Sequence, residues 1–327
     1  MKLCCNGFNL FGQLQVQAPI IYEFTPVFQF EVINKIFINQ TYSLLVTNDK
    51  SLIYYKKGVV DITSVIGKDF LKITCSDDRI LFIDETKQVN IIELGNFMNK
   101  RIIYEKCVKN ISIGSKITIL YTLDGGLINV PQPLNFHCNR ICDIKSGKEH
   151  CLLLDEEGNV YSMGAGSRGQ LGHGKLDYEP NPLLIEALAG IKIKKIATGG
   201  WHSCAVSQDG DLYVWGWNSN GQLGLGKKND EAGYVSTMAT PHVVDFFDDT
   251  LNCLLVSCGS RHTIIFLGNR HFSEDISIFN VRLLGTFIIF LNLEGHFRIS
   301  TCPSHLKHAS RINTNKSSSP YISSSSM

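Results

Sequence analysis

Short runs in which apolar and polar residues alternate dominate the clearest part of this chain. Residues 212–215 read Leu-Tyr-Val-Trp, the period-2 pattern of a strand with one buried face. Asp209-Gly210, just before this run, is a two-residue hairpin signal, because glycine tolerates the positive φ that a tight turn between twisted strands requires. The pattern therefore predicts β-strands near residues 194–198, 203–208 and 211–216.

This pattern occurs twice at a fixed spacing. Residues 147–174 and 199–226 align without a gap, 52 positions apart, so that His150 matches His202. A fixed period of this length indicates a repeat architecture. One small antiparallel unit leaves an apolar face uncovered, and radial stacking of such units into a propeller covers it. The repeated positions, which we expect to be structural, are Gly147, His150, Gly158, Gly164, Gln170, Gly172, Gly199, Gly200, His202, Gly210, Gly216, Gln222, Gly224, Gly259 and His262.

Weaker units flank this clear pair. The clear repeats cover 141–226 and 237–266, and degenerate repeats cover 34–134. In the degenerate units the histidine position holds Tyr42, Arg79 and Ile117. The spacing from each of these residues to the next, and from Ile117 to His150, is 33 to 38 residues. These spacings are shorter than the 52 residues of the clear pair, and the difference corresponds to the Gly-Gln-Leu-Gly segment, which the degenerate units lack. We therefore expect these units to keep their inner hairpins and to lose the outer loop, so that one side of the ring is trimmed.

Both ends of the chain depart from the repeat. We expect the propeller to cover 1–267, and residues 7–14 align with a third strand and turn, which predicts an N-terminal clasp over 3–16 that completes the last unit. Residues 268–327 are expected to form a divergent tail, basic and serine-rich, with a disordered end. The apolar stretch 276–293 has too short an uncharged core to span a membrane, but its residue types favour a strand that can help to close the ring.

At these motifs the chain resembles a known family. Gly-Gly-Trp-His, Asp-Gly-Asp-Leu-Tyr-Val-Trp-Gly and Gly-Gln-Leu-Gly-Leu-Gly are similar to the repeat of the regulator-of-chromosome-condensation (RCC-type) family of seven-bladed β-propellers. The resemblance is strong over 141–226, fair over 237–266, weak before 141 and absent after about 268. It implies an all-β propeller of the seven-bladed type, incomplete at its C-terminus.

Composition changes this picture little. The chain has 327 residues, 44% of them hydrophobic and 19% charged, as in ordinary soluble domains. A formal net charge of +1 gives no global attraction to nucleic acid or to an anionic membrane. The 11 cysteines have no regular framework spacing, and no convincing signal peptide precedes them. We therefore expect reduced thiols in a cytosolic or nuclear protein.

The sequence predicts no catalytic residues, no cofactor and no metal site. His150, His202 and His262 share one repeat position on separate units, so they cannot converge on one ligand. We expect each to bond a backbone carbonyl through one ring nitrogen. The segment 137–142 offers one histidine and two cysteines, but it lacks the paired Cys-x2-Cys spacing of zinc knuckles, and core cysteines are the simpler interpretation.

Trp201, Trp217 and Arg261 are the candidate partner-binding residues. The position of Trp201 is occupied by Glu149 and Arg261 in the other clear units, so the fold does not require tryptophan there. Tryptophan and arginine are enriched in interface hot spots. The alternative for both tryptophans is burial between neighbouring units.

The resemblance also implies a function. Family members include nucleotide exchange factors for a Ran-type GTPase, ubiquitin-ligase scaffolds and small chromatin-linked propellers. The divergent N-terminal units and the opening Gly-Phe-Asn-Leu-Phe-Gly-Gln-Leu resemble the last group most. This implies a non-enzymatic partner of a JmjC-domain histone demethylase that acts in histone methylation and chromosome segregation. It would reside in the nucleus, with the cytoplasm as a second location.

Histones or chromatin are further partners that the resemblance implies, whereas a membrane and a small-molecule substrate are not expected. One alternative is a guanine nucleotide exchange factor for a Ran-like GTPase, which would need an inserted wedge and a regular ring. The other is a ubiquitin-ligase-associated scaffold, which would need a further catalytic domain.

Overall fold

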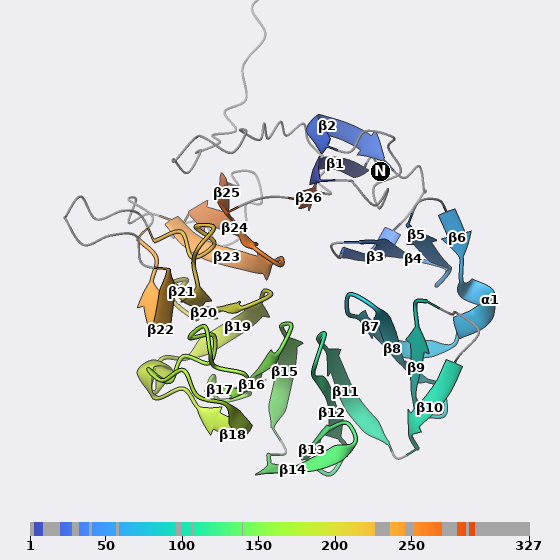
Figure 1. The fold of residues 1–327 in the computed structure, drawn as a ribbon, viewed down its shortest axis with the longest axis horizontal. Coiled ribbons are helices and arrows are strands. Elements are labelled where there is room, and N and C mark those ends of the chain that lie inside the picture. Colours follow the sequence, from blue (N-terminus) through green and yellow to red (C-terminus); the bar gives the residue numbers. More distant parts are fainter. Residues whose placement is uncertain are drawn as a thin grey trace, which may run out of the picture.

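The computed structural model describes residues 3–8, 20–27, 33–38, 41–56, 59–95, 100–105, 107–138, 140–225, 236–245, 251–269, 280–285 and 288–291. Its strands form antiparallel sheets arranged in a ring (Figure 1). The all-β propeller expected from the sequence is confirmed.

Five of the sheets have four strands each, and the strands follow one another in chain order. These sheets are β3 (Ile33–Ile38), β4 (Ser43–Thr47), β5 (Leu52–Tyr55) and β6 (Val59–Asp61); β7 (Phe70–Cys75), β8 (Arg79–Asp84), β9 (Val89–Glu93) and β10 (Lys100–Tyr104); β11 (Val108–Ile113), β12 (Thr118–Thr122), β13 (Gly126–Asn129) and β14 (Gln132–His137); β15 (Ile141–Ser146), β16 (His150–Asp155), β17 (Val160–Gly164) and β18 (Glu179–Leu184); and β19 (Ile193–Thr198), β20 (His202–Ser207), β21 (Leu212–Trp217) and β22 (Thr237–Val243). Two short helical segments, α1 (Thr63–Ile66) and η1 (Glu186–Leu188), lie in connections between these strands.

Two further sheets, of three strands each, complete the ring between β22 and β3 (Figure 1). One consists of β23 (Leu251–Cys258), β24 (His262–Asn269) and β25 (Asn280–Gly285). The other consists of β2 (Ile20–Val27), β1 (Leu3–Phe8) and β26 (Ile288–Leu291), with β1 in the middle. The apolar stretch near the C-terminus therefore supplies a strand to each sheet, and the first and last described strands pair in antiparallel register from Cys4↔Leu291 to Gly7↔Ile288.

The strands expected from the alternating pattern are confirmed as β19, β20 and β21, and the matching strands 52 residues earlier are β15, β16 and β17. The degenerate units keep their inner hairpins and have short outer connections, as expected, and each also has a fourth, outer strand: β6, β10 and β14. Only their outer connections are shorter. Residues 130–131 join β13 to β14, whereas residues 165–178 join β17 to β18.

The count of repeat units from the histidine position misses the sheet of β2, β1 and β26. This sheet has no histidine position, although the end of β1 lies in the segment that aligns with a third strand, and its strands come from both ends of the chain. Residues 9–16 of the expected clasp and residues 292–327 of the tail lie outside the described residues.

The hydrophobic core is divided into layers that lie between neighbouring sheets. One layer joins Val206 and Val214 to Ile265 and Leu267 of the next sheet, and all four side chains are buried. The other clusters likewise draw on two adjacent four-stranded sheets. Because no sheet buries its apolar faces alone, the position of each blade depends on its neighbours.

Candidate functional site

In the two clearest repeats, the histidine at the start of the second strand bonds one sheet to the next. Nε2 of His150, on β16, lies 2.9 Å from Oγ of Ser203 on β20. Nε2 of His202 lies 2.9 Å from Oγ1 of Thr263 on β24. Both imidazoles are completely buried. The two histidines therefore sit on separate interfaces of the ring and do not share a ligand.

Each of these contacts continues into a three-group relay. The Ser203 hydroxyl donates to the Gln170 carbonyl at 2.9 Å, and the Thr263 hydroxyl donates to the Gln222 carbonyl at 2.8 Å. A hydroxyl has one proton, so the imidazole Nε2–H must donate to it. The prediction that these histidines bond a backbone carbonyl directly is therefore wrong: a hydroxyl of the next sheet stands between the two groups.

The relay at His150 is made by a neutral ring. Burial lowers the pKa of His150 to about 3, and the nearby His202 contributes to this shift. Within the described part of the chain, Nδ1 of His150 and of His202 has no hydrogen-bond partner. Each imidazole is buried and bonds the next sheet through Nε2, so this arrangement does not place either ring against an accessible substrate.

The glycine three residues before each histidine makes room for the ring. A Cβ on Gly147 would lie 2.3 Å from Cε1 of His150, and one on Gly199 would lie 2.1 Å from Cε1 of His202. Gly259 stands in the same relation to His262. Gly200 lies beside Gly199 in the loop before β20.

The remaining repeat positions lie at turns and at the outer loop. Gly158 and Gly210 are in the hairpins between the second and third strands. Gly164 and Gly216 lie in the third strands with φ of 104° and 101°, a conformation that a residue with a Cβ rarely adopts. The other positions, which lie in the loops after the third strands, are Gln170, Gly172, Gln222 and Gly224.

The glutamine side chains hold these outer loops together. Oε1 of Gln170 accepts a hydrogen bond from the Arg168 amide at 2.8 Å, and Oε1 of Gln222 accepts one from the Asn220 amide at 2.9 Å. The indole of Trp215, on the next sheet, donates to the Gln170 carbonyl at 2.9 Å. The loop after β17 is thus fixed to the next sheet, and this loop carries Arg168.

The Arg168 side chain belongs to a group of side chains that we call the cation–aromatic cluster: Lys148, Arg168, Trp201, Trp217 and Arg261. The two tryptophan rings meet edge to face, with centroids 5.6 Å apart. The Arg168 guanidinium lies 4.6 Å from the centroid of Trp201 and 4.7 Å from that of Trp217. Lys148 lies 5.0 Å from the Trp201 ring, and Arg261 lies 5.8 Å from the Trp217 ring.

Three neighbouring sheets contribute to the cluster, which brings together all three candidate partner-binding residues. Trp201 and Trp217 are partly exposed, so neither is fully buried between the sheets, and Arg261 is exposed. Lys148 pairs with Asp77 at 3.4 Å. Among the described residues, no carboxylate forms an ion pair with Arg168 or Arg261. Sequence reasoning missed Arg168 and Lys148, because their positions in the repeat do not show that both side chains lie over the same indole.

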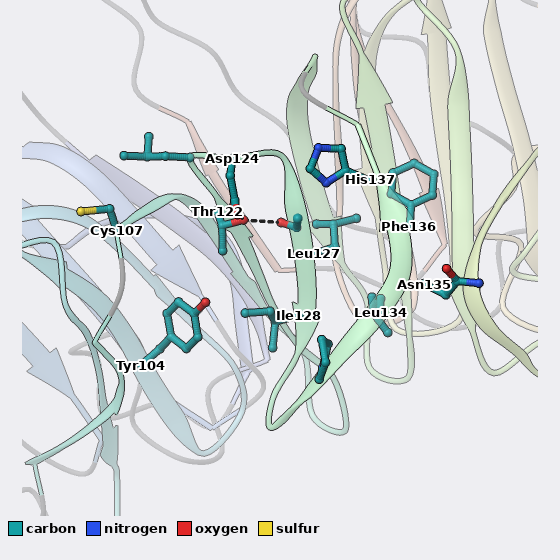
Figure 2. A pocket seen from close by; sticks show the side chains of 13 residues that line it. Tyr104, Cys107, Thr122, Asp124, Leu127, Ile128, Leu134, Asn135, Phe136 and His137 are labelled. Atoms are coloured by element: carbon teal, nitrogen blue, oxygen red, sulfur yellow. Dashed lines mark hydrogen bonds between the residues drawn. The ribbon is translucent and has the colours of Figure 1, made fainter.

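A second feature is a hollow of about 620 Å³ beside β10, β13 and β14 (Figure 2). Its lining includes Cys107, Asp124 and His137, residue types that occur in nucleophilic sites. Figure 2 shows Cys107 and His137 on opposite sides of the hollow, with Thr122 between them. In the region that the structure describes, no hydrogen bond joins Cys107 to Asp124 or His137. The hollow therefore does not assemble a catalytic set.

The structure also corrects the interpretation of the cysteines in the segment 137–142. Cys142 is exposed and Cys138 is partly exposed, so Cys142 is not a core residue. The cysteines that do lie together are Cys204 and Cys258, beside His202, and the three potential ligand atoms lie within 4.8 Å of one another. No sequence signal points to this group, because its members come from two different sheets.

Comparison with known proteins identifies the repeat. Residues 157–206 and 209–266 match the family described as "Regulator of chromosome condensation (RCC1) repeat", and a second match with the same description covers residues 141–170 and 193–222. These residues therefore form RCC1-type repeats. None of the helices in the described part of the chain has the length and hydrophobicity that crossing a bilayer requires.

Relatives with the same repeat match part of the chain. The mouse protein "RCC1 domain-containing protein 1" is 39% identical over 154 residues, which are 38% of this chain and 41% of that protein. The human protein of the same name is 52% identical over 90 residues, 28% of this chain and 24% of that protein. The matched region thus spans less than half the length of these relatives.

The fold extends over more of the chain than the sequence match does. Yeast RCC1 (Prp20), in a crystal structure with Kap60, superimposes with a TM-score of 0.69 at 14% identity, covering 86% of this chain and 78% of Prp20. A second structure, of Prp20p from Saccharomyces cerevisiae, has a TM-score of 0.59 at 16% identity, covering 84% and 92% of the two chains. Prp20p is described together with its binding properties to Gsp1p and histones.

Proposed function

We propose that this chain, in which residues 141–266 are RCC1-type repeats, is a non-enzymatic protein-interaction propeller and a chromatin-associated partner of a JmjC-domain histone demethylase. In this proposal it resides in the nucleus, acts in histone methylation and chromosome segregation, and uses the cation–aromatic cluster to bind its partner. The observation that carries the proposal is the cluster itself, which presents two tryptophans and three cations on one face.

The chemistry of the cluster fits a protein partner with an acidic segment. Arg168 is held between the two indoles, so its guanidinium is oriented before a partner arrives. Pre-organisation of this kind lowers the entropic cost of binding. An arginine without a carboxylate partner can pair with a carboxylate from another protein, while partly exposed tryptophans supply apolar contact area.

The similar proteins support this class of function in different ways. The RCC1 domain-containing relatives share the repeat, and the family match covers the residues of the cluster. The binding properties described for Prp20p include histones, which supports histones as further partners here. They also include Gsp1p, which supports exchange activity on a Ran-like GTPase as the second candidate function.

We also propose how the ring is organised. The propeller covers residues 1–267, and the strands β25 and β26 from the divergent tail extend it. If the two three-stranded sheets are counted as blades, the ring is of the seven-bladed type, with an incomplete end where β1 meets β26. The repeated glycines, histidines and glutamines are structural in this proposal, because their contacts join strands and loops within the ring.

Affinity purification of the chain from nuclear extract, followed by mass spectrometry, tests the proposed partner. We expect a JmjC-domain demethylase to be enriched with the wild type and to be lost with Trp217→Ala. In parallel, nucleotide release from a Ran-like GTPase is measured with the same purified chain. Accelerated release without demethylase binding would replace the proposal with the exchange-factor alternative.

A further inference from the structure

Two cysteines meet at the interface between the sheets of β20 and β23. Sγ of Cys204, on β20, lies 3.4 Å from Sγ of Cys258, the last residue of β23. Both cysteines are free thiols. Cys204 is completely buried, whereas Cys258 is partly exposed. The two residues are 54 positions apart in the chain.

The preceding interface shows that the fold does not need this pair. There, the positions that match Cys204 and Cys258 are occupied by Leu152 and Thr198. The same relay of histidine, hydroxyl and glutamine carbonyl forms at both interfaces. The cysteines are therefore an addition to a contact that is complete without them.

His202 completes a set of three potential metal ligands with the cysteines, but its ring is already in use. Its Nε2 donates to the Thr263 hydroxyl, which also lies 3.8 Å from Sγ of Cys258. A metal ion bound through this nitrogen would break the relay that joins the two sheets. A bond between the two sulfur atoms would leave the relay intact.

We propose that Cys204 and Cys258 form a reversible disulfide, which links the two neighbouring sheets when the protein meets a peroxide. A disulfide has an S–S length of about 2.05 Å, so the sulfur atoms must approach by about 1.4 Å. The inference concerns a modification site and is independent of the partner-binding proposal.

The surroundings of the two thiols give them different roles. Burial alone raises the pKa of both thiols, but at Cys258 the hydrogen bond with Cys204 and the charge of the nearby His202 outweigh burial and lower its pKa. At Cys204 burial dominates and raises the pKa. Because the thiolate is the nucleophile, Cys258 reacts first, and Cys204 resolves the product.

The reaction proceeds in two steps that balance. The Cys258 thiolate attacks one oxygen of the peroxide, the O–O bond breaks, a sulfenic acid forms, and the hydroxide that leaves takes up a proton to become water. The Cys204 sulfur then attacks the sulfenic sulfur, the S–S bond forms, the S–O bond breaks, and the hydroxide leaves as water with the proton from Cys204. Two thiols are oxidised, hydrogen peroxide is reduced, and two waters result.

The test uses the full chain, purified with reductant, freed of it and treated with hydrogen peroxide. Remaining thiols are then alkylated, and the protein is digested and analysed by mass spectrometry. We expect a peptide pair linked through Cys204 and Cys258, lighter by two hydrogen atoms than the separate peptides. We also expect both residues to lose alkylation together and to recover it with dithiothreitol. The linked protein should melt at a higher temperature, because the cross-link restricts the unfolded chain.

Matched variants control the assignment. Cys151→Ser removes another buried thiol of the ring and should leave the linked peptide unchanged. Cys204→Ser should abolish it and let Cys258 proceed to the sulfinic acid. The proposal is overturned if the wild type keeps both thiols free while the exposed Cys107 is oxidised. It is also overturned if the reduced protein retains one zinc ion per chain that protects both thiols from alkylation.

Discussion

The clear repeats and the degenerate repeats build the same kind of sheet with different interface chemistry. In the clear units, His150 and His202 reach the next sheet through a buried hydroxyl. In the degenerate units, the Tyr42 hydroxyl donates directly to the Ser76 carbonyl, and Nη2 of Arg79 donates to the carbonyls of Gly114 and Ser115 at 3.0 and 2.8 Å. What the fold requires is therefore contact across the interface at this position, and histidine is one way to make it.

Ile117 extends the comparison, because it makes no hydrogen bond through its side chain. It is buried in a core layer that also contains Cys151 of the next sheet. Apolar packing thus replaces the side-chain hydrogen bond at this position. The two regions differ most in the outer connection, since only the clear units have the long loop that carries Arg168 over the tryptophans.

The largest expected effect comes from filling the space beside a histidine of a clear unit. In Gly199→Ala the new Cβ would lie 2.1 Å from Cε1 of His202 and 2.6 Å from the Gly259 carbonyl oxygen. Such overpacking should lower the free energy of unfolding by about 3 kcal/mol, measured by urea denaturation. The control is Gly95→Ala in the degenerate region, where a Cβ would meet nothing within 4 Å. Equal stability of both variants would contradict the account.

Removing the interface donor should have a smaller effect, and it should differ between the two regions. His202→Ala should lower the free energy of unfolding by about 2 kcal/mol, because it leaves buried polar groups without a partner. Arg79→Ala should cost only about 1 kcal/mol, because the Arg79 side chain is 20% exposed and water can replace it at the carbonyls. Thermal and urea denaturation of both variants check this order. A larger loss for Arg79→Ala would show that the degenerate interfaces are the more demanding ones.

The smallest of the stability effects is a dependence on pH. The pKa of His150 is about 3 in the folded chain and about 6.5 in an unfolded one, so the unfolded state binds the proton first as the pH falls. Its contribution is fully present above pH 6.5 and decreases below it, by about 1 kcal/mol between pH 6.5 and 5.5. Urea denaturation of the wild type and of His150→Gln over this range measures it. The same slope in both proteins would contradict a neutral, buried His150.

Much of the fold could be predicted from the sequence, because the repeat has local signals. The hairpin at Asp209-Gly210 and the glycines around His202 define strands wherever they occur. The sheet of β1, β2 and β26 could not be counted from the histidine position, because it depends on pairing between distant parts of the chain. The short outer connections of the degenerate units could be predicted, because the missing Gly-Gln-Leu-Gly segment shortens the spacing between units.

The candidate site could be predicted only in part. Trp201 and Arg261 stood out because they differ from one another at a shared repeat position. Arg168 lies between the two indoles only because the loop after β17 is fixed to the next sheet through the Gln170 carbonyl. The pairing of Cys204 with Cys258 likewise depends on how neighbouring sheets face each other.

The measurement that tests the central claim most directly is the affinity of the chain for the proposed demethylase partner when one charge in the cluster is reversed. Arg168→Glu places a carboxylate between the two tryptophans. The control is Lys192→Glu, which makes the same change of charge away from the cluster. Lys192 lies directly before β19, at the end of that strand opposite Trp201. Isothermal titration calorimetry should show that Arg168→Glu weakens binding by about tenfold or more, whereas Lys192→Glu leaves it unchanged. Equal affinity of Arg168→Glu and the wild type would contradict the claim that this cluster is the interaction site.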